Sequence, residues 1–175
     1  MRPWIALFSR TGSEIVEISN QLGQWPDLII TNKTDLSNVV EILTYRSDFQ
    51  IRQIPNNPTV RDYHKFFHKS ALITLNGYLR IIPAEICDSY EIYNGHPGLI
   101  TKYPVLKGRD PQQKAFDLYL PTSGSVIHRA TREVDSGKVI ASREIGIIHK
   151  KLPEVFEVLH KNSVDLWVDF LRERL

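Results

Sequence analysis

The stretch SALITLNGY, residues 70–78, decides the fold. Residues 71–75 are apolar except for Thr74, and an asparagine and a glycine follow them directly. A short apolar run that ends in turn-forming residues is typical of a buried strand. We therefore interpret this stretch as a central strand of a sheet.

On both sides of this strand, short apolar runs alternate with stretches of helical spacing. The expected strands cover residues 4–8, 27–32, 49–55, 89–94, 124–131 and 138–147. The expected helices begin near Ser13 and cover 35–46, 59–69, 110–120 and 153–175, with Asp35 and Asp110 as N-caps. This alternation predicts an α/β fold with a largely parallel sheet, organised as one domain over residues 1–175.

Composition and charge argue against nucleic-acid binding, an internal disulfide and a membrane span. The net charge of +2 is small, and basic residues are scattered among acidic ones, so the sequence does not predict nucleic-acid binding. A single cysteine, Cys87, cannot form an internal disulfide. No stretch reaches the roughly 20 apolar residues of a membrane span, and the first residues do not resemble a signal peptide. We expect a cytoplasmic protein without a membrane partner.

Glycine stands beside polar side chains at the ends of several expected strands. Four such segments are SRTGS (9–13), LNGYLRIIP (75–83), YNGHPG (93–98) and REVDSG (132–137). Open α/β sheets bind ligands at the carboxyl ends of their strands. We therefore expect these four segments to form the functional site.

The segment YNGHPG carries the strongest chemical signal. Asn94 and His96 lie on the same side of an extended chain, since side chains alternate along a strand. An amide and an imidazole that face one point can stabilise an oxygen that gains negative charge, and the imidazole can transfer protons. Asp135 can supply a third group, which orients a water molecule or keeps the histidine charged. The alternative is structural: Asn94 caps a turn and His96 makes one hydrogen bond.

Two other features allow a functional and a structural interpretation. The turn SRTGS could hold an anion at a helix N-terminus, or it is an ordinary turn capped by Thr11 or Ser13. His64 and His68 have metal-ligand spacing, but no third ligand lies nearby in the sequence. We favour a solvated helix edge there and predict no metal.

With these residues in view, the sequence resembles the folate-dependent formyltransferase superfamily, and within it the glycinamide ribonucleotide formyltransferases. The first motif is an asparagine, any residue, and then His-Pro at the end of a central strand, here residues 94–97. The second motif consists of Gly124, His128, Asp135 and Gly137. The resemblance spans most of residues 1–147.

The resemblance implies a Rossmann-like open sheet flanked by helices, and a reaction that uses 10-formyltetrahydrofolate as co-substrate, as in purine biosynthesis. Asn94 and His96 would stabilise a tetrahedral oxyanion, and Asp135 would assist proton transfer. The partners would be folate and a small amine, and a homodimer is one candidate assembly.

The resemblance also implies three binding groups. The pterin pocket would be lined by Tyr78, Leu79, Arg80, Ile81, Ile82 and Ile92. The loop that closes over the pterin would be Thr131, Arg132, Glu133 and Val134. The amine substrate would face Arg10, Thr11, Gly12, Ser13, Gly77 and Arg61.

Departures from the family pattern concern the acceptor. Gly98 and Thr101 replace a serine and a proline, and Arg10 and Thr11 change the phosphate turn. The final helix places His160 where the ribonucleotide enzymes carry other side chains. The acceptor is therefore the glycinamide ribonucleotide or another nucleotide- or sugar-linked amine. A formyltetrahydrofolate hydrolase and a non-catalytic folate-binding homologue are the alternatives.

Overall fold

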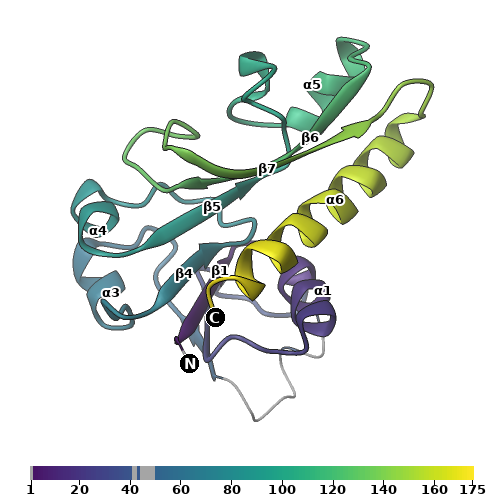
Figure 1. Cartoon of the computed structure of the whole chain (residues 1–175). Coiled ribbons are helices and arrows are strands. Elements are labelled where there is room, and N and C mark those ends of the chain that lie inside the picture. Colours follow the sequence, from purple (N-terminus) through teal and green to yellow (C-terminus); the bar gives the residue numbers. More distant parts are fainter. Residues whose placement is uncertain (1, 41–42, 44–49) are drawn as a thin grey trace.

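The computed structural model describes residues 2–40, 43 and 50–175. Its centre is a seven-stranded sheet with the order β3-β2-β1-β4-β5-β6-β7 (Figure 1). The strands are β1 Trp4–Phe8, β2 Leu28–Thr31, β3 Gln50–Gln53, β4 Leu72–Leu75, β5 Ile92–His96, β6 Thr122–Arg129 and β7 Val139–Gly146. Strand β4, which lies within the stretch SALITLNGY, is the middle strand of the seven.

The sheet is mostly parallel and open. Strands β3, β2, β1, β4 and β5 run parallel to one another, whereas β6 and β7 form an antiparallel extension next to β5. In parallel strands the carboxyl ends meet at one edge, so the segments after β1, β4 and β5 are brought together. This confirms the predicted open α/β sheet.

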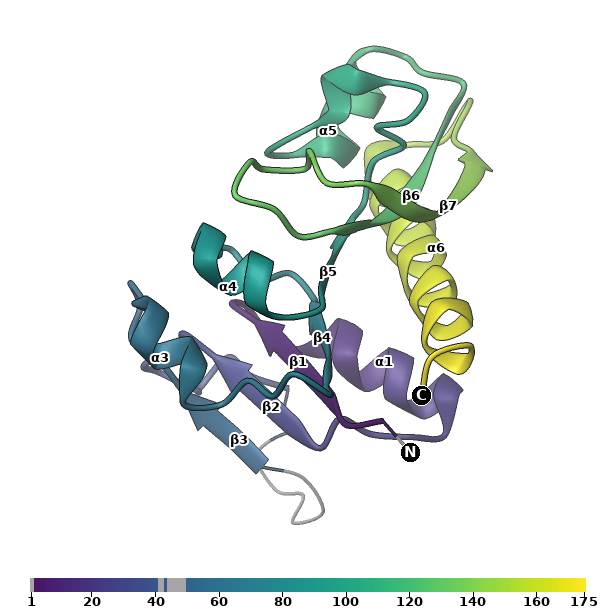
Figure 2. The same cartoon turned by 60° about the vertical axis from the view of Figure 1, so that its left-hand side comes forward.

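Helices cover both faces of the sheet (Figure 2). Helices α1 (Ser13–Leu22) and α6 (Leu152–Arg172) pack on one face, where Trp4, Phe8 and Trp167 share one core. Helices α3 (Val60–His64) and α4 (Ala84–Ser89) pack on the opposite face with a second core. The short helices η1 (Pro104–Leu106) and α5 (Pro111–Asp117) lie beside a third core near β6.

Burial explains why β1 and β4 consist almost entirely of apolar residues. All five residues of β1 and all four of β4 are buried, because helices cover the sheet on both sides. The polar members of these strands are paired: the indole N–H of Trp4 donates to Thr74 Oγ1 at 2.9 Å. This buried core therefore fixes the positions of β1 and β4, and with them the segments that follow these strands.

Several predicted elements differ from the structure. Residues 35–40 of the predicted 35–46 helix form a turn, in which Asp35 accepts bonds from the backbone and hydroxyl of Ser37 at 2.8 and 2.9 Å. Residues 41–42 and 44–46 of that prediction lie outside the described residues. The helix predicted over 59–69 is the shorter α3, and α4 was not predicted. Asp110 stands before α5 with a positive φ of 54° and makes no side-chain cap.

Within the part of the chain that the structure describes, no helix is both long and apolar enough to cross a membrane.

Candidate active site

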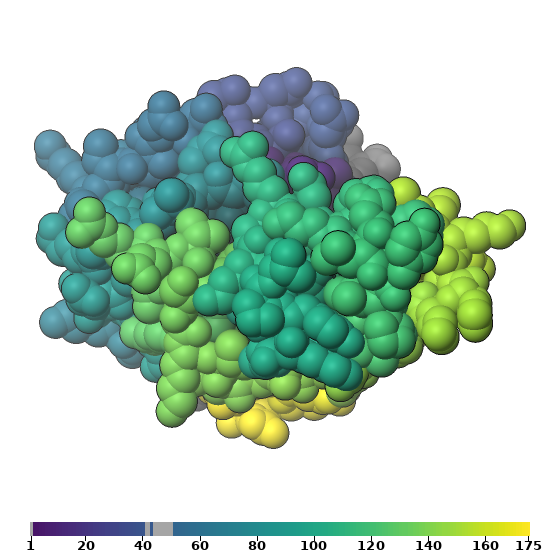
Figure 3. Space-filling model, turned by 90° about the horizontal axis from the view of Figure 1, so that it is seen from above, coloured from purple at the N-terminus to yellow at the C-terminus, as the bar shows by residue number. Residues whose placement is uncertain are grey.

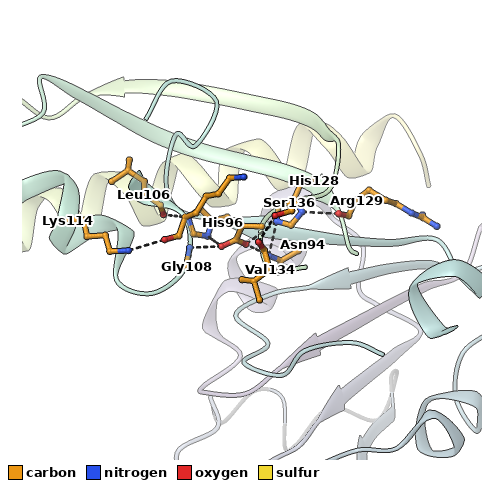
Figure 4. Close-up of polar contacts among 11 residues, drawn as sticks. Asn94, His96, Leu106, Gly108, Lys114, His128, Arg129, Val134 and Ser136 are labelled. Carbon is orange, nitrogen blue, oxygen red and sulfur yellow. Dashed lines mark hydrogen bonds and ion pairs between the residues drawn. The ribbon is translucent and has the colours of Figure 1, made fainter. Parts of the chain in front are cut away.

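Strand β5 delivers two polar side chains to one point at the sheet edge. Asn94 pairs with Leu75 of β4 on one side and directly with His128 of β6 on the other. Residues directly opposite on antiparallel strands point to the same face of a sheet. Asn94, His96 and His128 therefore lie on one face, and the close-up in Figure 4 shows them converging.

Asp135 completes this cluster from the loop between β6 and β7. Its Oδ2 lies 3.2 Å from Nδ1 of His96, and its Oδ1 lies 3.3 Å from Nε2 of His128. Asn94 Nδ2 lies 3.1 Å from His128 Nε2 and 3.4 Å from Asp135 Oδ1. The backbone N–H of Gly108 donates to Asp135 Oδ2 at 2.9 Å. The structure thus brings together the three residues predicted to be catalytic.

The backbone of the β6–β7 loop is constrained where it presents the carboxylate. Asp135 itself has a positive φ of 49°, a left-handed conformation that aspartate tolerates better than most residues. Two residues later, a Cβ on Gly137 would lie 1.7 Å from the carbonyl oxygen of Arg129. Only glycine allows this close approach, so Gly137 fixes the path that aims Asp135 at the cluster.

We expect Gly137→Ala to disturb both the loop and the cluster. The added methyl meets backbone and not a flexible side chain, so the loop must shift, at a cost of about 1–3 kcal/mol in free energy of unfolding. Gly146→Ala at the end of β7 is the matched control, because no atom lies within 4 Å of its added Cβ. Urea unfolding of both variants tests this, and equal stabilities would contradict it.

His96 is held from both sides of its ring. Its Nε2 lies 2.8 Å from the carbonyl oxygen of Leu106, which can only accept, so Nε2 carries a proton. A second proton taken up by His96 would then lie between Nδ1 and the Asp135 carboxylate. Burial lowers the pKa of His96, while the Asp135 charge and the Leu106 carbonyl act in the opposite direction. A neutral ring with Nδ1 facing a carboxylate can accept a proton and release it again.

Gly98, where the chain departs from the family pattern, lies against this ring. A Cβ on Gly98 would lie 2.9 Å from His96 Nε2 and 2.8 Å from Cβ of Pro111. The glycine therefore allows the segment after β5 to pack tightly on the imidazole.

Asp135 stays ionised although it is buried. Burial raises the pKa of its carboxyl, but the contacts with the two histidines and the hydrogen bond from the Gly108 N–H outweigh burial, so the pKa lies below the ordinary value. Asp135 thus keeps a negative charge beside Nδ1 of His96, and this charge favours a proton taken up there.

Acidification is expected to destabilise the fold through His96. Its pKa is lower in the folded chain than in the unfolded chain, so below about pH 6.5 the unfolded state binds more protons. As the pH is lowered, this one group then decreases the free energy of unfolding by at most about 1.4 kcal/mol per pH unit. Urea unfolding at pH 7.5 and 5.5 measures the loss, which His96→Gln should reduce. An equal loss in His96→Gln would contradict the assignment.

The residues expected around the pterin are divided between core and surface. Tyr78, Ile82 and Ile92 are buried in the core on the α3–α4 face. Leu79, Ile81 and Val134 expose more than half of their surface, as apolar contacts for a flat ring would require. Thr131, Arg132 and Glu133 are exposed on the β6–β7 loop. Arg80 donates to Asn56 and to the Leu79 carbonyl.

The residues expected around the amine do not all meet. Arg10, Thr11, Gly12 and Ser13 form the turn between β1 and α1, and Gly77 approaches it because its carbonyl accepts the Ser9 N–H at 3.2 Å. Arg61 lies on α3, which covers the opposite face of the sheet from α1. The structure therefore does not place Arg61 in this turn.

A polar cleft of about 340 Å³ is formed by the segments that follow β1, β2, β3 and β4. It is lined by Ser9, Asn32, Lys33, Thr34, Asp35, Asn56, Leu79 and Arg80. None of the three predicted catalytic residues lines it. From above, the segments that follow β5 cover the front of the molecule, with the N-terminal half behind them (Figure 3).

Three further groups hold the cluster in place. His128 belongs to the second motif, but its contacts with Asn94 and Asp135 follow from the pairing of β5 with β6. The Leu106 carbonyl and the Gly108 N–H come from the segment after β5, whose backbone carries no sequence signal. Of these three groups, only His128 can be identified from the sequence, because it belongs to the second motif and lies seven residues before Asp135.

Curated relatives of the chain have been found over part of its length. A phosphoribosylglycinamide formyltransferase of Bacillus subtilis is 32% identical over 97 residues, which cover 54% of this chain and 48% of the relative. A mitochondrial formyltetrahydrofolate deformylase 2 of Arabidopsis thaliana is 30% identical over 80 residues, 45% of this chain and 24% of the relative. The matched segments thus span about half or less of these curated relatives.

The fold has close structural relatives as well. The crystal structure of phosphoribosylglycinamide formyltransferase from Anaplasma phagocytophilum has a TM-score of 0.82 and 17% identity, covering 98% of this chain and 86% of that one. The family model described as formyl transferase matches residues 10–165, which include the whole cluster around Asp135. The chain therefore belongs to the formyl transferase family.

Proposed function

We propose that this protein transfers a formyl group from 10-formyltetrahydrofolate to a small primary amine. The observation that carries the proposal is the convergence of Asn94, His96 and His128 on the buried carboxylate of Asp135. Family membership supports the same chemistry.

In the proposed reaction the amine nitrogen attacks the formyl carbon, and the carbonyl oxygen becomes an oxyanion. Asn94 donates to that oxygen, and His96 takes up the proton released by the attacking nitrogen on Nδ1, beside Asp135. The positive charge that His96 gains stabilises the oxyanion. The bond between the formyl carbon and N10 of the folate then breaks, and the proton passes to N10. The products are the formylated amine and tetrahydrofolate.

His128 and the backbone of the segment after β5 have a positioning role. His128 donates from Nδ1 to the Arg129 carbonyl at 2.9 Å, which leaves Nε2 free to accept from the Asn94 amide. The Gly108 N–H holds Asp135 Oδ2 beside His96. These contacts keep the three groups in place before substrates bind.

The folate and the amine are assigned to different parts of the sheet edge. The exposed apolar side chains Leu79, Ile81 and Val134 would contact the pterin. The turn at residues 10–13 would face an amine linked to a sugar or nucleotide, for which phosphoribosylglycinamide is the first candidate because it is named in several relatives. No step of this chemistry requires a metal.

Hydrolysis of 10-formyltetrahydrofolate is the second candidate reaction, because one relative is a formyltetrahydrofolate deformylase. Water would replace the amine at the same cluster, and formate would be released. An optical assay of 10-formyltetrahydrofolate consumption with and without a panel of amines separates the two. We expect consumption only with an amine. Equal consumption without amine, together with formate release, would establish the hydrolase, and no consumption at all would contradict both.

A further inference from the structure

The polar cleft at the ends of β1, β2, β3 and β4 has no part in the chemistry described so far. Its volume of about 340 Å³ lies in the range of small-molecule sites. Two cations line it, Lys33 and Arg80, against a single carboxylate, Asp35. The cleft therefore carries net positive charge, which favours an anionic ligand.

A chain of hydrogen bonds joins the strand ends that line this cleft. The Leu79 N–H donates to Ser9 Oγ at 2.8 Å, and the Ser9 hydroxyl donates to Asn32 Oδ1 at 2.6 Å. Asn32 Nδ2 donates to Asn56 Oδ1 at 3.0 Å, and Arg80 Nε donates to the carbonyl oxygen of Asn56 at 2.6 Å. These bonds hold the guanidinium of Arg80 at the cleft, so its positive charge is in place before a ligand binds.

Lys33 is the cation whose side chain is available to a ligand. Its backbone is fixed, because its N–H donates to Thr31 Oγ1 at 3.2 Å and its carbonyl accepts from Gln53 Nε2 at 2.8 Å. Asp35 instead accepts the N–H and the hydroxyl of Ser37 at 2.8 and 2.9 Å. Within the described ranges, no carboxylate forms an ion pair with the Lys33 ammonium group. This group can therefore pair with a ligand without breaking an ion pair of the protein.

The cleft is separated from the catalytic cluster by the width of several strands. The order β2-β1-β4-β5 places β2, which Lys33 follows, three strand spacings from β5, which carries Asn94 and His96 (Figure 2). Neighbouring strands are about 4.8 Å apart, so the two backbones are about 14 Å apart. The turn at residues 10–13 follows β1 and lies between them. A ligand that reaches both ends must therefore be an extended molecule, with an amine at one end and an anion at the other.

We propose that Lys33 binds a phosphate group at the far end of the acceptor, with Arg80 as a second, fixed positive charge. A doubly charged phosphate matches two cations better than a single carboxylate does. The acceptor is then an amine linked to a sugar phosphate or a nucleotide, and its sugar lies over the turn at residues 10–13. This inference rests on the proposed formyl transfer and specifies its acceptor.

Titration with ribose 5-phosphate tests the phosphate site without any turnover. We expect Lys33→Gln to bind this probe about tenfold more weakly than the wild type in calorimetry, because a charge-assisted hydrogen bond to the phosphate is lost. Asp35→Asn should bind it more tightly, because it removes the negative charge that lines the cleft. Equal affinity in Lys33→Gln and the wild type, or no binding to the wild type, would overturn the proposal.

The matched control for this titration is Lys69→Gln. Lys69 is exposed and shortly precedes β4, so it lies at the opposite edge of the sheet from the cleft. Its replacement removes the same charge from the protein and should leave the affinity for ribose 5-phosphate unchanged. An equal loss of affinity in Lys33→Gln and Lys69→Gln would show that only the net charge matters, and this too would overturn the proposal.

Steady-state kinetics identifies which substrate uses the cleft. With phosphoribosylglycinamide and 10-formyltetrahydrofolate, Lys33→Gln should raise the KM of the amine about tenfold and leave kcat and the KM of the folate unchanged. A rise in the KM of the folate alone would assign the cleft to the carboxylates of the folate and overturn the proposal. If the wild type does not formylate this amine, formyl transfer fails for this acceptor, and the titration with ribose 5-phosphate still decides the role of Lys33.

Discussion

Replacing His96 by alanine is expected to reduce the rate of formyl transfer by about a thousandfold, within the range for loss of a general acid–base group. The imidazole is the group that takes up the proton of the attacking amine, and its Nδ1 lies 3.2 Å from Asp135. Affinity for the folate should change little, because the proposed pterin contacts lie on other residues. Single-turnover kinetics and a fluorescence titration with folate measure the two quantities.

The control for this variant is His68→Ala. His68 is exposed and follows α3, on the face of the sheet that α1 does not cover, and it makes no contact with the cluster. Its replacement should leave the rate unchanged. A His96→Ala protein that is folded and retains more than about a tenth of the rate would remove His96 from the mechanism.

Asp135→Asn is expected to have an effect of similar size, for a different reason. The substitution keeps the shape of the side chain but removes the charge that Gly108, His96 and His128 surround. Without that charge, protonation of His96 loses the carboxylate that favours it, so proton transfer should slow by about a thousandfold. The pH–rate profile should also lose the change in rate that protonation of His96 causes.

The matched control for the second variant is Asp88→Asn, an exposed carboxylate at the end of α4. Circular dichroism and urea unfolding establish that both proteins are folded before rates are compared. Asp135→Asn with the rate and pH profile of the wild type would show that the carboxylate has only a structural role.

Local sequence signals sufficed for the parts of the site that lie on strands. Strand β4 is a largely apolar run that Asn76 follows directly, and β5 itself carries Asn94 and His96. The parallel pairing of the two strands brings these residues to the same edge of the sheet. The motif predicts Asp135, whereas its left-handed backbone and the close approach at Gly137, which direct the side chain, are visible only in the structure.

Contacts between segments far apart in the sequence could not be predicted in the same way. The burial of Glu14 depends on Ser163, which is 149 residues away, and on the packing of α6 against α1. The hydrogen bond from His96 to Leu106 joins two positions through a backbone carbonyl, which every residue has. Among the described residues of the helix predicted over 35–46, residues 35–40 form a turn, in which Asp35 accepts the N–H of Ser37.

The most direct test of formyl transfer follows the carbon itself. The purified protein is incubated with 10-formyltetrahydrofolate labelled with ¹³C in the formyl group and with the amine that supports turnover. Mass spectrometry and ¹³C NMR then measure where the label appears. We predict one labelled formyl group on the amine for each molecule of tetrahydrofolate formed. Label recovered as free formate, or retained on the folate, would contradict formyl transfer by this protein.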